Sequence, residues 1–311
     1  MTSKFKSFLS LIIVGLSFVF ASYPVNAFSQ AAAHNRPVGI IISKEIRPFI
    51  RMVEGIEENL RMPSCRIFFD KRGMPYGCDS GSKGIGPGRF SVAVAVGPQA
   101  LEYLIRHEWS GPLVYGMILN PDAITMHTDR FCGVSLDIPY WEQISSIHKI
   151  FPLVRRLGIL YDPANNQTRF ERTKKISGLQ GITVVPLVVT KKNPISDYFE
   201  EKIRDLDAII FIPDRTVISQ AVVQYVIKKA ILQGIPSIGY NRFFHDSGAA
   251  LSFVIDYRKV GKRVAGQVRN ILMGRPCARL VPDYKIVLNV RVIEKLNLRL
   301  GDNLPSAVER D

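Results

Sequence analysis

The sequence contains few of the residues that build metal and redox sites. Its 311 residues include four cysteines and five histidines. No Cys-x-x-Cys pair occurs, and no two histidines lie three to five positions apart, as zinc ligands often do. The HExxH motif, the GxSxG nucleophile motif and the GK[ST] ending of a phosphate-binding loop are also absent. We therefore expect no metal site, no cofactor and no catalytic residue.

Acidic residues are the minority charge. The chain has 27 acidic residues against 41 lysines and arginines, a net charge of +14. Such a balance would suit a nucleic acid, a membrane surface or an anionic ligand. The basic residues are nevertheless spread along the chain in short pairs, with no continuous basic run and no aromatic stacking platform beside them. We interpret them as solvated surfaces and predict no nucleic-acid partner.

The most apolar run is short for a comfortable membrane span of about 20 residues. It extends from Phe8 to Ala21 and follows Lys4 and Lys6, and small residues precede position 28. This pattern predicts a signal peptide over residues 1–27, cleaved after Ala27, and therefore a periplasmic protein. An uncleaved N-terminal anchor is the alternative.

The rest of the chain alternates short apolar strands with amphipathic helices. Continuous apolar strands indicate burial on both faces, as in a parallel sheet covered by helices. The predicted strands of the first half recur in the second half about 115 to 125 positions later, a spacing that suits two βαβ domains. In pairs, the strands are VGIIIS with RRLGILYDP, SVAVAVGP with LDAIIFIPD, and PLVYGMILN with IPSIGYN. At about 150 residues per domain the length also predicts two domains, and so we expect two Rossmann-like lobes.

Ligands of open α/β sheets bind at the carboxyl ends of the strands, which here would border a cleft between the lobes. Helices predicted after several of these ends would direct free N–H groups into the cleft and favour an anionic group on the ligand. Each polar residue there could instead only cap a helix. The candidate ligand-binding residues are Ser43, Gly97, Pro98, Asn120, Tyr161, Asn165, Asp214, Thr216 and Asn241.

A series of motifs carries a family resemblance over nearly all of the chain after the predicted signal peptide. In order they are GVSLDIP, RRLGILYDP, LDAIIFIPDRTVIS, GIPSIGYN, SGAALSFVIDYRKVGKRVAGQVRNILMG and VLNVRVIEKLNL. The chain resembles the substrate-binding proteins of ABC transporters, which have the type I periplasmic binding protein fold. The resemblance implies two lobes with parallel sheets joined by three crossover strands. It also implies a non-enzymatic receptor that closes on a small molecule.

The resemblance further predicts the limits of the lobes and the partners. The first lobe is expected at 35–131 plus 256–277, and the second at 132–255 plus 278–311. Asp256 joins the candidate ligand residues, with a helix N-cap as its alternative role. The expected partner is an ABC permease in the inner membrane. A membrane sensor kinase is the alternative, and we expect a monomer.

Export would place the four cysteines in an oxidising compartment, where pairing is the default. Cys65 and Cys78 are close in sequence and could form a local disulfide across a loop. Cys132 and Cys277 would have to pair over a long loop. In the resembling fold both would lie at crossovers, which makes their pairing geometrically conceivable.

The aromatic residues near the predicted strand ends could line an apolar pocket, or could belong to the core. They are Tyr115, Tyr161, Tyr240, Phe243 and Phe244. Together with carboxylates and helix N-termini, they suit a zwitterion, and we expect an amino acid or a related small carboxylate as the ligand. Asp214 is the acid expected to accept the ammonium group, unless it only caps a helix. In the second case Asp214→Asn should leave affinity nearly intact.

Overall fold

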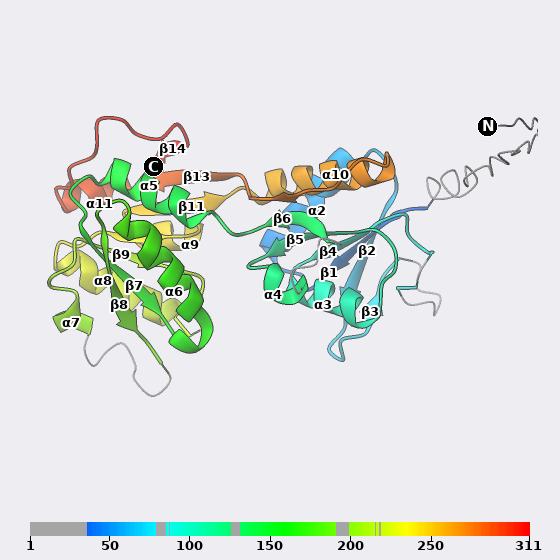
Figure 1. The fold of residues 1–311 in the computed structure, drawn as a ribbon, viewed down its shortest axis with the longest axis horizontal. Coiled ribbons are helices and arrows are strands. Elements are labelled where there is room, and N and C mark those ends of the chain that lie inside the picture. The colour runs from blue at the N-terminus through cyan, green and yellow to red at the C-terminus, as the bar shows by residue number, and fades with distance from the viewer. Residues whose placement is uncertain are drawn as a thin grey trace, which may run out of the picture.

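The computed structural model describes residues 36–78, 85–86, 88–125, 131–190, 199–214, 216–217 and 219–311. The predicted signal peptide lies outside these residues. The chain forms two α/β lobes, each built on a mostly parallel seven-stranded sheet (Figure 1). The predicted fold class, two Rossmann-like lobes of the type I periplasmic binding protein kind, is confirmed. No helix in the described ranges is long and apolar enough to cross a membrane.

The first lobe contains the sheet β12-β6-β5-β4-β1-β2-β3, in which β2 and β3 pair in antiparallel fashion and the other neighbours in parallel. Its strands are β1 (Val38–Ile42), β2 (Ser64–Phe69), β3 (Pro75–Tyr76), β4 (Ala93–Val96), β5 (Leu113–Ile118), β6 (Cys132–Ser135) and β12 (Arg279–Leu280). Its helices are α2 (Arg47–Leu60), α3 (Pro98–Arg106), α4 (Asp122–Thr125) and α10 (Tyr257–Leu272).

The second lobe contains the sheet β14-β13-β11-β10-β9-β7-β8, in which the pair β11 and β13 is antiparallel. Its strands are β7 (Arg156–Tyr161), β8 (Thr183–Val188), β9 (Ala208–Phe211), β10 (Ser237–Gly239), β11 (Leu251–Ile255), β13 (Tyr284–Leu288) and β14 (Val308–Arg310). Its helices are α5 (Tyr140–Ile150), α6 (Pro163–Gly178), α7 (Phe199–Lys202), α8 (Gln220–Leu232), α9 (Arg242–Asp246) and α11 (Val290–Lys295).

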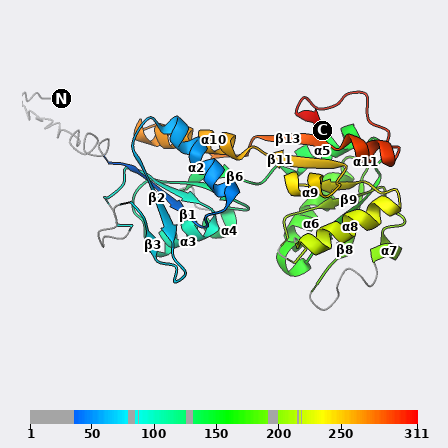
Figure 2. The same cartoon turned by 180° about the vertical axis from the view of Figure 1, so that it is seen from behind.

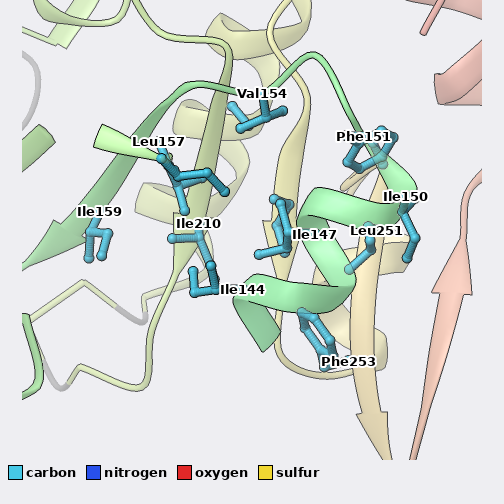
Figure 3. Packing of buried hydrophobic residues seen from close by; sticks show 14 of the residues in the cluster. Ile144, Ile147, Ile150, Phe151, Val154, Leu157, Ile159, Ile210, Leu251 and Phe253 are labelled. Atoms are coloured by element: carbon cyan, nitrogen blue, oxygen red, sulfur yellow. The ribbon is translucent and has the colours of Figure 1, made fainter. Parts of the chain in front are cut away.

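The central strands are apolar throughout because both faces of each sheet are covered. In β1, Ile40 and Ile42 pack into one core with α2 and α10, whereas Ile41 packs into the core beneath α3. The second lobe repeats this arrangement. Figure 3 shows Ile144, Ile147 and Ile150 on α5, turned toward strand residues of one core. Burial on both faces thus explains the continuous apolar runs.

Within the described residues the chain passes between the lobes at three places, visible from both sides in Figures 1 and 2. They follow β6 at residues 136–139, β11 at Asp256, and β12 at 281–283. Strands β6 and β12 pair within the first sheet before the chain crosses. The first sheet therefore extends a few residues past the expected limits at 131 and 277, and the exact lobe limits stay a prediction.

Both disulfides join residues of the first lobe. Cys65 in β2 bonds to Cys78 after β3, with the Cα atoms 5.6 Å apart. Cys132 in β6 bonds to Cys277 after α10, with the Cα atoms 5.8 Å apart and 145 positions between them. Because the second sheet is formed from residues between Cys132 and Cys277 and from later ones, the long disulfide closes a loop that contains most of the second lobe.

Helices α2 and α10 cross at two glycines. A Cβ atom on Gly261 would lie 2.1 Å from the carbonyl oxygen of Met52, and one on Gly55 would lie 2.3 Å from that of Arg258. Both obstacles are backbone atoms, which cannot rotate away as a side chain can. The close crossing of the two helices therefore needs glycine on both sides.

We expect Gly261→Ala to lower the free energy of unfolding by about 1–3 kcal/mol, because the added methyl group must push α10 away from α2. Gly266→Ala on the same helix is the matched control. Its Cβ would meet nothing closer than a side-chain nitrogen of Arg269 at 3.9 Å, and alanine there should be neutral or slightly stabilising. Urea unfolding measures the stability of both variants, and equal stabilities would contradict the need for glycine where the two helices cross.

Candidate functional site

The strand ends of the first lobe are joined by a serine that caps a neighbouring helix. Ser43, just after β1, accepts a hydrogen bond on its Oγ from the Ala100 N–H at 2.9 Å. Helix α3 begins at Pro98 after Gly97, which has a φ of 89° and no side chain to supply a cap. A Cβ on Gly97 would lie 2.8 Å from the Ser43 Oγ. The sequence-predicted residues Ser43, Gly97 and Pro98 thus form one compact corner.

The strand ends of the second lobe share a buried network around Asp214, which is 3% exposed. One carboxylate oxygen of Asp214 accepts hydrogen bonds from the Asp162 N–H at 2.8 Å and from Asn166 Nδ2 at 2.7 Å. The other accepts from the Thr216 N–H at 2.8 Å. This carboxylate therefore ties the loop after β9 to the loop after β7.

Thr216 completes the network. Its hydroxyl donates to a carboxylate oxygen of Asp162 at 2.8 Å and accepts from Asn165 Nδ2 at 3.2 Å. Asp162 also caps α6 by accepting from the Ala164 N–H at 3.0 Å. The described partners of both carboxylates, Asp162 and Asp214, are neutral N–H and O–H groups. Two buried negative charges near one surface favour a cation beside them.

Asp137 connects the two lobes at the first crossover. One carboxylate oxygen accepts from the Asn120 N–H, after β5 of the first lobe, at 2.5 Å. The other accepts from Arg169 Nη2, on α6 of the second lobe, at 2.9 Å. The backbone at Asn120 is in the left-handed region, with a φ of 47°, which asparagine tolerates better than most residues. The predicted residue Asn120 thus lies at the junction of the lobes.

Two tyrosines share the electrostatic environment of Arg169. Its guanidinium carbon lies 5.4 Å from the centre of the Tyr140 ring. Burial raises the pKa of the Tyr140 phenol, and the positive charge of Arg169 opposes that rise. Burial and the negative charge of Asp214 likewise raise the pKa of Tyr240, again against Arg169. Both phenols are therefore neutral hydrogen-bonding groups at neutral pH, and the Tyr240 hydroxyl is buried without a partner among the described residues.

Three other predicted residues use their side chains to cap a helix or to pack on one. Asn241 caps α9 by accepting from the Phe243 N–H at 3.0 Å, and Asp256 caps α10 by accepting from the Lys259 N–H at 3.2 Å. The Tyr161 ring stacks on Phe170 with the centroids 4.6 Å apart. These caps account for Asn241 and Asp256 structurally, and their role in ligand binding stays a prediction.

The sequence analysis did not select Asp137, Arg169 or Asn166 as site residues. Asn166 lies at a kink in α6, with a φ of −135°. Its two acceptors, the Pro213 carbonyl and the Asp214 carboxylate, are 47 and 48 positions away. The one available signal was the position of Asp137 just after the buried strand β6. The partners of all three residues come from distant segments, which a linear pattern does not reveal.

Two lobes whose strand ends carry hydrogen-bonded polar groups, joined by three crossovers, have the architecture of a type I periplasmic binding protein. A comparison with protein families agrees, because residues 89–309 match the family described as "ABC transporter substrate binding protein". The chain belongs to this family, whose members are non-enzymatic solute-binding proteins. A search of curated proteins finds no match.

Solved structures with the same fold span nearly the whole chain. One, "the ABC domain in complex with L-Trp" from Streptococcus pneumonia, is 18% identical, with a TM-score of 0.63, and the match covers 88% of this chain and 99% of that one. Another, the ligand-free, open structure of CD0873 from Clostridium difficile, a substrate binding protein with adhesive properties, is 15% identical. Its TM-score is 0.69, with 89% and 99% covered. At these identities the likeness concerns the fold.

Proposed function

We propose that this protein captures an amino acid or a related small carboxylate between its two lobes and delivers it to an ABC permease. The observation that carries this proposal is the pair of polar strand-end faces, one on each lobe. The buried carboxylates Asp162 and Asp214 favour an ammonium group on the ligand. The match to a structure that holds L-Trp supports the same ligand class.

Export through a cleaved signal peptide at 1–27 and a periplasmic location are part of this proposal, as is action as a monomer. Family membership supports the location, since a binding protein must meet its permease outside the inner membrane. Lobe closure would then be driven by a ligand that contacts both faces at once, because a ligand shifts an equilibrium only by its differential affinity for the two states.

A thermal-shift screen tests the ligand class. The panel holds amino acids, small organic acids, sugars, polyamines and nucleosides. We expect amino acids or carboxylates to raise the melting temperature, because a ligand at 100 times its dissociation constant stabilises the folded state by about 2.7 kcal/mol. Stabilisation by sugars, polyamines or nucleosides alone would show that the proposed ligand class is wrong.

Whether the ligand contacts both lobes is tested by replacing one asparagine in each lobe. Asn120→Ala and Asn165→Ala should each weaken binding of the amino acid found by about 3- to 10-fold, the value of one hydrogen bond. Asn303→Ala is the control, because Asn303 is exposed in the segment that follows α11. Affinity is measured by calorimetric titration. Unchanged affinity in both site variants would show that these strand ends do not bind the ligand.

A further inference from the structure

Arg169 is a largely buried cation whose contacts among the described residues are one carboxylate, Asp137, and one aromatic ring, Tyr140. Its side chain is 13% exposed and donates one hydrogen bond, to Asp137. A guanidinium carries five N–H donors. Its other four find no acceptor among the residues that the structure describes. Leaving charged donors unpaired away from water is costly, so this group is suited to an additional acceptor.

Arg169 lies close to polar groups of both lobes. The carboxylate of Asp137 accepts hydrogen bonds both from Arg169 and from the Asn120 N–H of the first lobe. The helix that carries Arg169 begins at the Asp162 network of the second lobe, and the arginine's charge acts on Tyr240 as well as on Tyr140. The guanidinium therefore lies where the strand ends of both lobes approach the first crossover.

The surrounding charges restrict which anion fits. Asp137 already offsets the charge of Arg169. Asp162 and Asp214 add two further negative charges on the same lobe, against one positive charge from the exposed Arg172, which also acts on Tyr140. A dianion such as phosphate or a dicarboxylate would face net repulsion there. A monocarboxylate suits the planar guanidinium, which can donate two parallel hydrogen bonds to it.

We propose that Arg169 binds the carboxylate of a monocarboxylate ligand, with Asp137 orienting the guanidinium and linking the bound ligand to the first lobe. The proposal rests on the proposed function and assigns one group of the ligand to one side chain. The ammonium of an amino acid would then be directed toward Asp162 and Asp214. Amino acids with an acidic side chain would be selected against.

Calorimetric titration with matched probes tests the assignment. The probes are L-tryptophan and L-leucine, their amides, which lack the carboxylate, and 3-indolepropionate and 4-methylpentanoate, which lack the ammonium. We expect the wild-type protein to bind an amino acid about 10- to 100-fold more tightly than its amide, the value of a charge-assisted hydrogen bond. In Arg169→Gln this preference should fall to near unity.

Lys174→Gln is the matched control, because it removes one positive charge from an exposed position on the same helix. It should keep the wild-type preference. Circular dichroism checks that the variants fold. If Arg169→Gln does not fold, Arg169→Lys keeps the charge but loses the planar pair of donors, and it should lower the preference for the carboxylate several-fold.

The outcomes separate this proposal from the proposed function. An amino acid that binds Arg169→Gln with an undiminished preference over its amide overturns the role of Arg169 and leaves the function standing. If only the carboxylates without an ammonium bind, and do so through Arg169, the amino-acid ligand is wrong and the role of Arg169 stands. If no carboxylate binds the wild-type protein, both are overturned.

Discussion

Replacing both Cys132 and Cys277 by alanine is expected to lower the free energy of unfolding of the first lobe by about 5 kcal/mol. The disulfide spans 145 positions, and the chain-entropy cost that it removes from unfolding grows with loop length. It also fastens β6, just before the first crossover, to the segment between α10 and β12. Loss of the bond should therefore affect the first lobe more than the second.

The double variant Cys65→Ala and Cys78→Ala is the control. Its loop spans 13 positions, and the same relation gives a loss of about 3 kcal/mol. Urea unfolding monitored by hydrogen exchange shows which lobe loses stability. Equal losses in the two double variants would mean that the second lobe stays folded and shortens the long loop while the first lobe unfolds. No loss in either would contradict the stabilising role of both bonds.

Asp214→Asn is expected to cost about 2–4 kcal/mol of stability. Three N–H donors point at the two carboxylate oxygens of Asp214. An amide keeps one oxygen, so its NH₂ group must face at least one of these donors and leave it unpaired. The network would then loosen at Thr216 and Asn166, with weaker ligand binding as an indirect result.

Asp205→Asn is the control, because Asp205 is exposed in the second lobe. Thermal unfolding without ligand should separate the two variants clearly. If Asp214→Asn keeps full stability and loses affinity, its carboxylate contacts the ligand ammonium directly. If stability and affinity are both unchanged, Asp214 is not part of the ligand-binding site.

The fold could be predicted because its strongest signals are local. Runs such as VGIII, AVAV and LVYGMI are apolar throughout since both faces of β1, β4 and β5 are buried. The pair β2 and β3 was not predicted. It turns at Asp70, whose carboxylate accepts from the Arg72 and Met74 N–H groups, and half-buried β2 lacks a continuous apolar run.

The site was predictable in position and less so in detail. Strand ends identified Asn165, Asp214 and Thr216, which the structure brings together. The expectation that Asp214 either caps a helix or meets a ligand missed a third role. It joins two loops, and Ser219 caps α8 instead. The link between Asp137 and Arg169 spans 32 positions and depends on how α6 packs beside the crossover, which no local pattern encodes.

The insertion of most of the second lobe between parts of the first has a consequence for folding kinetics. The first sheet acquires β12, and the helix α10 that covers β5 and β6, from sequence that follows most of the second lobe. Until that sequence is available, the early strands keep an exposed edge and an uncovered apolar face. Contacts so distant in sequence slow folding. When the chain is made from its N-terminal end, the second lobe can thus acquire most of its structure before the first lobe is complete.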